Sequence, residues 1–308
     1  MKTRLRGQTL PRCAPICYAC GEVHLGQSFL SQLFGSGKSS ESSTAEAPKG
    51  RVSNRELQGA IQNAKDDPAG ISEARLMLEQ MKGQLSNADR VKAYRQLAAA
   101  PNYRNQRDNT KDPSSTCNFT SQAMAFEGLG QNFDEETKGK QGEEQLYDRF
   151  YKKGFGSRVE EKDRLKLARD QGFGASQLDT PAFGSAAEAK KWFDDNIKPA
   201  LENGASATMG VKSGTFKHVV RVQWIEAKGV LIDDPWGASV GNTKGEFGYT
   251  KLNPEAEPGK KRTLDKDQAG DGNDRLIPWE TIATVMSNRY VQLYTSSAKN
   301  QPQISPKT

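Results

Sequence analysis

The order of hydrophobic periodicities along the chain is the feature that most constrains its fold. Apolar residues recur at helical spacing in segments up to residue 203, at 53–64, 68–81, 86–97, 117–127, 143–153, 159–171 and 186–203. After Gly204 the pattern becomes short alternating runs typical of strands, at 206–212, 218–226, 229–234, 247–252 and 290–294. Helical segments followed by strands at hairpin spacing predict an α+β fold with an antiparallel sheet.

Local capping signals support several of these helix boundaries. Ser53 and Glu56 have the S-x-x-E spacing of a capping box, in which each side chain accepts from the other residue's backbone N–H. Pro68 and Ser86 precede the next two helical patterns, and Gly128 and Gly130 follow the segment that begins at Cys117. These signals predict where the helices start and stop.

Composition divides the chain into four parts. Residues 1–50 form a cysteine-containing leader, whose Gly/Ser-rich stretch at 35–45 is typical of a flexible linker. Residues 51–100 form a small helical region, which we expect to serve delivery, inhibition or recognition. Residues 101–296 hold the main domain, and residues 297–308 are expected to be a disordered tail.

Charge and hydropathy narrow the classes of partner. The net charge is +6, but acidic and basic residues are interspersed, so we expect no nucleic-acid partner. No apolar run approaches the roughly 20 residues that span a bilayer. The basic start is followed by a charged, cysteine-rich stretch and not by a secretory core. We expect a protein made in the cytoplasm without a classical signal peptide and, if it leaves, delivered to another cell by a dedicated secretion system.

The cysteines are unevenly distributed. The leader holds three of the four cysteines, so disulfides are not expected to staple the main domain. Cys13, Cys17, Cys20 and His24 have a spacing compatible with zinc, although reduced thiols in a flexible segment explain the same pattern. We therefore name them only as weak zinc candidates, and we expect no cofactor.

The remaining cysteine is a candidate nucleophile. Cys117 follows a run of turn-forming residues and opens a predicted helix, where backbone N–H groups and the helix dipole stabilise a thiolate. The alternative is a small buried hydrophobic residue. His218, the only histidine after the leader, starts a predicted strand and is the candidate base.

A predicted hairpin supplies a partner for this histidine. Counting across the turn at 227–229 places Asp234 within about three positions of the residue opposite His218. Asp233 should point to the other face, although a slip of one residue would exchange the two aspartates. Asp234 could also be simply a turn residue before Pro235.

Three motifs together resemble a known family. They are TCNFTS at 116–121, KHVV at 217–220 and IDDPWG at 232–237. They are similar to the Cys, His and Asp boxes of the bacteriocin-processing-like branch of papain-like cysteine peptidases, over about residues 102–296. This resemblance implies a papain-like fold, in which the nucleophile helix packs on an antiparallel sheet that carries the histidine and the aspartate.

The resemblance also implies roles for individual residues. Cys117 would be the nucleophile, His218 the general base and Asp234 its orienting partner. Gln106 would donate to the oxyanion, or it is an ordinary loop glutamine. Asn118 and Trp236 are candidates for the substrate cleft, although Trp236 could merely cover the hairpin.

The chain departs from the family pattern at several points. Lys217 and Asn118 stand where the family usually has glycine, and the sequence contains no Gly-Gly pair, after which exporter-linked members cut. Self-processing at such a site is therefore not expected. These departures affect the expected substrate more than the triad.

The resulting prediction is a thiol-dependent hydrolase, a cysteine peptidase that is a bacterial effector or toxin acting on protein targets. Its partners would be a protein or peptide substrate and a cognate inhibitor or immunity protein. The alternatives are a cell-wall peptide hydrolase or amidase, a deamidase or acyltransferase with the same triad, and a catalytically silent binding module.

Overall fold

A computed structural model describes residues 52–65, 67–133, 141–213, 216–237, 250–251 and 272–296. These residues belong to one compact unit. The leader with its four zinc candidates, and the tail at 297–308, lie outside the described residues.

The described helices follow the sequence pattern closely. They are α2 (Asn54–Asn63), α3 (Pro68–Met81), α4 (Asn87–Ala98), the short 3-10 helix η1 (Gln106–Asp108), α5 (Cys117–Glu127), α7 (Gly142–Lys152), α8 (Glu161–Asp170), α9 (Ala186–Asn196), α10 (Lys198–Glu202) and α11 (Trp279–Val285). The segment expected to be one helix over 186–203 is broken at Ile197. Pro199 has no N–H to donate to the preceding turn, which explains why α9 does not continue through it.

The capping box at the start of α2 is confirmed. Ser53 Oγ accepts from the Glu56 N–H at 3.3 Å, and the Glu56 carboxylate accepts from the Ser53 N–H at 2.7 Å. Ser86 likewise caps α4 by accepting from the Asp89 N–H. These two caps are local bonds between residues three apart, which is why the sequence predicts them correctly.

Seven described strands form one antiparallel sheet. They are β1 (Gly174–Asp179), β2 (Ser206–Ser213), β3 (Phe216–Glu226), β4 (Gly229–Asp233), β5 (Thr250–Lys251), β6 (Arg275–Pro278) and β7 (Tyr290–Thr295). Their order across the sheet is β1-β7-β2-β3-β4-β6-β5. The predicted α+β class is therefore confirmed. The sequence pattern missed β1 and β6, which are short and lack a clear alternation, and the helix α11 between β6 and β7.

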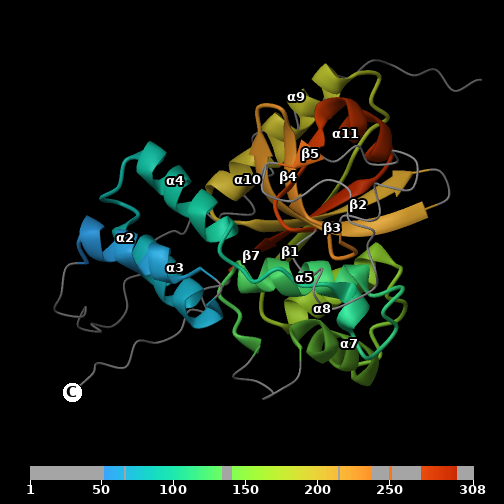
Figure 1. Ribbon diagram of the computed structural model, residues 1–308, viewed down its shortest axis with the longest axis horizontal. Helices are drawn as coiled ribbons and strands as arrows, with labels where there is room; N and C mark the ends of the chain where they lie inside the picture. The colour runs from blue at the N-terminus through green and yellow to red at the C-terminus, as the bar shows by residue number, and fades with distance from the viewer. Residues whose placement is uncertain are drawn as a thin grey trace, which may run out of the picture. The chain divides into compact units, whose positions relative to one another are not determined.

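Helices cover both faces of this sheet. One buried cluster joins apolar residues of β2, β3, β4 and β7 to α9, α10 and α11. A second cluster packs α5, α7 and α8 with Phe173 and Tyr294. Figure 1 shows α9, α10 and α11 on one side of the sheet and α5, α7 and α8 on the other. Because both faces are covered, polar residues of β3 such as Arg221 and Gln223 are also buried.

Helices α2, α3 and α4 share their core with the sheet. Their buried residues, among them Leu57, Leu78 and Leu97, belong to the same cluster as the strands. A buried polar bridge reinforces this packing, since Arg221 of β3 donates to the carbonyl of Ala98 at the end of α4. The region at 51–100 thus has no separate core among the described residues; its part in delivery, inhibition or recognition stays a prediction.

Candidate active site

Cys117 is the first residue of α5 and lines a pocket of about 450 Å³. The turn before it includes Asp112, whose φ of 46° lies in the left-handed region and whose carbonyl accepts from the Ser115 N–H. The thiol is partly exposed. Burial raises the pKa of the Cys117 thiol, whereas the charge and the hydrogen bond of His218 lower it. The lowering outweighs the effect of burial, so the net pKa is below that of an ordinary thiol.

His218 lies on β3 and connects the cysteine to an aspartate. Its Nε2 is 2.7 Å from Asp234 Oδ1, and both side chains are buried, at 3% and 0% exposure. Burial lowers the pKa of His218, but Asp234 and then Cys117 raise it to about 10. The two shifts favour a thiolate beside an imidazolium at neutral pH.

The backbone around Asp234 is held from three directions. Its N–H donates to the Gly272 carbonyl at 2.9 Å, its carbonyl accepts from Tyr103 Oη at 2.6 Å, and its Oδ1 accepts from the Trp236 N–H at 2.9 Å. A Cβ at Gly272 would lie 2.0 Å from the Asp234 carbonyl oxygen, so only glycine allows this approach. Burial and then Asp234 raise the pKa of Tyr103 well above its usual value, so the phenol keeps its proton and donates.

The neighbouring Asp233 has different partners. It accepts from Arg221 at 2.6 Å and from Gln223 at 2.6 Å. The β3–β4 register pairs Arg221 with Asp233 and contains an irregularity between Val222 and Trp224. The structure therefore brings Asp234, and not Asp233, to His218, in agreement with the expected hairpin geometry.

Gln106 connects the aspartate loop to the cysteine loop. Its N–H donates to the Pro235 carbonyl at 2.8 Å, and its Nε2 donates to the Pro113 carbonyl at 3.0 Å. Gln106 is buried and lines the same pocket as Cys117. A primary amide carries two hydrogens on nitrogen, so the bond to Pro113 leaves one for a group in the pocket.

The two expected cleft residues also line the pocket, in different ways. The Asn118 side chain donates to the Arg158 carbonyl at 2.7 Å and so ties α5 to the segment before α8. Trp236 is half-buried, and its ring forms part of the lining. Trp236 also packs against the larger buried cluster, so its role in the cleft stays a prediction.

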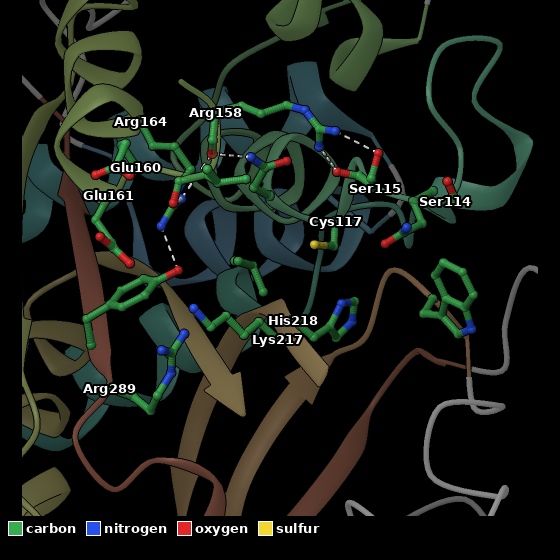
Figure 2. A pocket seen from close by; sticks show the side chains of 16 residues that line it. Ser114, Ser115, Cys117, Arg158, Glu160, Glu161, Arg164, Lys217, His218 and Arg289 are labelled. Atoms are coloured by element: carbon green, nitrogen blue, oxygen red, sulfur yellow. Dashed lines mark hydrogen bonds between the residues drawn. The ribbon is translucent and has the colours of Figure 1, made fainter. Parts of the chain in front are cut away.

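The sequence pattern missed a large part of the pocket wall. Figure 2 shows Arg158, Glu160, Glu161 and Arg164 from α8 and the segment before it, and Arg289 from the loop before β7. Arg158 donates to both the carbonyl and the hydroxyl of Ser115, close to the cysteine turn. No local motif marks these residues, because they approach Cys117 only when distant segments pack together.

The described residues contain no group of three or more His, Cys, Asp or Glu side chains placed to hold a metal. Within the same ranges, no helix has both the length and the apolar character needed to cross a membrane.

Comparisons with models of protein families, with curated proteins and with solved structures found no match for this chain. The geometry of the site is therefore the basis for proposing a function of this chain.

Proposed function

We propose that this chain is a thiol-dependent hydrolase, and more specifically a cysteine peptidase with a papain-like fold. The observation that carries the proposal is the chain of contacts from Asp234 through His218 to a thiol of lowered pKa at the start of a helix. The pocket beside the thiol leaves room for a substrate. Nucleophile, base and orienting carboxylate are the three parts that thiol catalysis of acyl transfer requires.

In the proposed mechanism the Cys117 thiolate attacks the carbonyl carbon of a peptide or amide bond. The His218 imidazolium then gives its proton to the leaving amine, and the C–N bond breaks to leave a thioester. Water, deprotonated by His218, attacks the thioester and releases the acid, and the thiol is restored. Asp234 keeps the His218 ring oriented and stabilises its positive charge.

The negative charge that develops on the carbonyl oxygen needs hydrogen-bond donors. The Cys117 N–H at the start of α5 is one candidate, and the second amide hydrogen of Gln106 is the other. The bonds of Gln106 to Pro235 and Pro113 support this role, because a donor that is already held in place costs no reorganisation during the reaction.

The biological setting belongs to the same proposal. The cysteine-containing leader and its Gly/Ser-rich linker favour an effector or toxin that acts on a protein target and has a cognate inhibitor. These features concern the sequence alone, and the chemistry proposed above does not depend on them.

Comparing new protein N-termini in whole-cell lysate treated with wild type or with Cys117→Ala tests the proposal. We expect discrete cleavage sites with wild type and a loss of at least about 10³-fold in rate with the variant. His218→Ala should cost about as much, and Asp234→Ala less, because orientation only assists proton transfer.

A variant with Cys13, Cys17 and Cys20 all changed to serine is the matched control, and it should retain full activity because the proposed chemistry uses only Cys117. A correctly folded Cys117→Ala protein that still cleaved the same bonds would refute the proposal.

A further inference from the structure

Outside the triad, the pocket beside Cys117 is lined by more basic than acidic side chains. Its lining includes the basic side chains of Arg158, Arg164, Lys217 and Arg289, against the carboxylates of Glu160 and Glu161. None of the four basic groups forms an ion pair with another described residue. In Figure 2, Arg164 and the two glutamates occupy the wall opposite Lys217 and Arg289.

Tyr290 organises two of the arginines. Its hydroxyl accepts from Arg164 Nη2 at 2.6 Å, and the guanidinium carbons of Arg164 and Arg289 lie 5.2 Å and 5.3 Å from its ring centroid. Arg164 is buried and also donates to the carbonyls of Arg158 and Val159. Its charge is therefore fixed in place behind the pocket, where solvent screens it poorly.

Arg289 is held in a different way. Its Nε donates to the Gly210 carbonyl at 3.1 Å, and its guanidinium carbon lies 5.3 Å from the centroid of the Tyr290 ring. The terminal Nη1 and Nη2 groups have no hydrogen-bond partner among the described residues. A guanidinium that is anchored through Nε and unoccupied at its forked end suits bidentate binding of a carboxylate.

Lys217 extends the same positive wall towards the catalytic centre. It is exposed, it lines the pocket, and it precedes His218 on β3. The β2–β3 register places Lys212 directly opposite it, which adds charge of the same sign. Glu160 and the half-buried Glu161 offset part of this charge, and the four basic groups leave the lining with an excess of positive charge.

We infer that Lys217 and Arg289 form a carboxylate-binding subsite, so that the favoured substrate carries an acidic side chain or a terminal carboxylate near the reacting carbonyl. The inference rests on the proposed thiol chemistry and adds a preference for substrate charge. It assigns the specificity to Arg289, which no sequence motif marks, and to Lys217, which stands where the resembled family usually has glycine.

Alkylation of Cys117 by charged and neutral reagents tests the inference without any knowledge of the natural substrate. The three reagents are iodoacetyl-Glu amide, with a side-chain carboxylate; iodoacetyl-Gln amide, which is neutral; and iodoacetyl-Gln acid, with a terminal carboxylate. In each case the thiolate attacks the CH₂ carbon, a C–S bond forms, the C–I bond breaks and iodide leaves. Second-order rate constants for Cys117 are measured by labelling the full-length protein, digesting it and quantifying the Cys117 peptide by mass spectrometry, apart from the peptides of Cys13, Cys17 and Cys20.

We expect at least one anionic reagent to react about 10-fold faster than the neutral one, since hydrogen bonds between charged groups are stronger than those between neutral groups. Lys217→Gln and Arg289→Gln should each reduce this ratio, and the double variant should reduce it to the value set by the remaining charges of His218, Arg158 and Arg164. The anionic reagent that reacts faster shows whether the subsite prefers a side-chain carboxylate or a terminal carboxylate. Lys92→Gln, an exposed residue of α4 outside the pocket, makes the same charge change and should leave the ratio unaltered.

The outcomes separate this inference from the proposed function. Equal rates for all three reagents, or a preference that the double variant keeps, would overturn the subsite even if peptide cleavage is established. If no reagent labels Cys117, the proposed thiol chemistry fails and the subsite fails with it. Lys217→Gln provides the readout if Arg289→Gln does not fold, because an exposed lysine makes little contribution to stability.

Discussion

At the scale of single residues, the site depends on an electrostatic chain of three side chains. Asp234 raises the pKa of His218, and the resulting positive charge lowers the pKa of Cys117. Both effects are strong because the histidine and the aspartate are buried, where water screens their interaction little. A change at Asp234 should therefore alter the pKa of the thiol through His218, which is hydrogen-bonded to Asp234.

The pH dependence of peptide cleavage should show this chain of effects. For wild type we expect kcat/KM to fall on the acid side as the thiolate is protonated, and on the basic side near pH 10 as His218 loses its proton. Asp234→Asn removes the charge that raises the His218 pKa, so the basic limb should move to lower pH. The measurement is kcat/KM across the pH range.

Asp195→Asn is the matched control, because it removes one negative charge on exposed α9, away from the pocket. Its two limbs should coincide with those of wild type. An Asp234→Asn profile that also coincides with wild type would contradict the electrostatic coupling.

At the scale of elements, the sequence predicts those structures that local patterns determine. The starts of α2, α3 and α4 follow from Ser53, Pro68 and Ser86, and the start of α5 at Cys117 follows from the turn before it. The strands β2, β3, β4 and β7 follow from alternation. In contrast, β1 and β6 form strands because the sheet offers them an edge or a neighbour, and their own residues give only weak signals.

The pairing of β2 with β7 places Gly210 opposite Tyr290, which lines the pocket. Gly210 is opposite Tyr290, and a Cβ at Gly210 would lie 2.3 Å from the tyrosine ring. The ring can therefore cover the glycine and still reach Arg164. The glycine thus serves the pocket wall as well as the sheet.

Gly210→Ala should displace the Tyr290 ring and with it the anchored Arg289. We expect a loss of about 1–3 kcal/mol in the free energy of unfolding, measured with urea, and a smaller preference for anionic alkylating reagents. Gly59→Ala is the control, because no atom lies within 4 Å of its added Cβ and alanine favours the helix α2. A Gly210→Ala protein as stable and as selective as wild type would show that the tyrosine does not position the arginine.

At the scale of the whole molecule, Arg221 of β3 joins the helical region to the sheet and also forms a buried ion pair with Asp233 of β4. Arg221 and Asp233 are exposed by only 1% and 2% at their side chains, and the same arginine bonds the carbonyl of Ala98. Asp233 is the residue next to Asp234, so this bridge also supports the loop that orients His218. The helices α2–α4 are thereby coupled to the site through packing and through this polar contact.

A double-mutant cycle should measure the interaction between Arg221 and Asp233. Arg221→Met leaves Asp233 buried without its cation and should lower the free energy of unfolding by about 3–5 kcal/mol. Adding Asp233→Asn should restore part of that loss, since the unpaired charge is then gone. Urea unfolding of the four proteins gives the interaction energy, and strictly additive losses would contradict the coupling.

The exposed pair of Lys191 and Asp195 on α9 is the reference for this cycle. Its side chains are 77% and 56% exposed, so Lys191→Met should cost less than about 1 kcal/mol.

The α+β class, most helix boundaries and the residues Cys117, His218 and Asp234 of the candidate site are predictable from the sequence alone. These features depend on hydrophobic period, capping residues and a single hairpin, all of which act over short distances along the chain. The Asp234 position was predictable because the turn between β3 and β4 is short.

Only the tertiary structure decided which other residues surround the thiol and which segments share its core. Arg158, Arg164 and Arg289 meet Lys217 in one pocket, and Gly272 approaches Asp234, because segments far apart in sequence pack against the same strands. The helices at 54–98 share the core of the sheet for the same reason. Such contacts are set by the closure of the fold around a common core, and no local pattern records them.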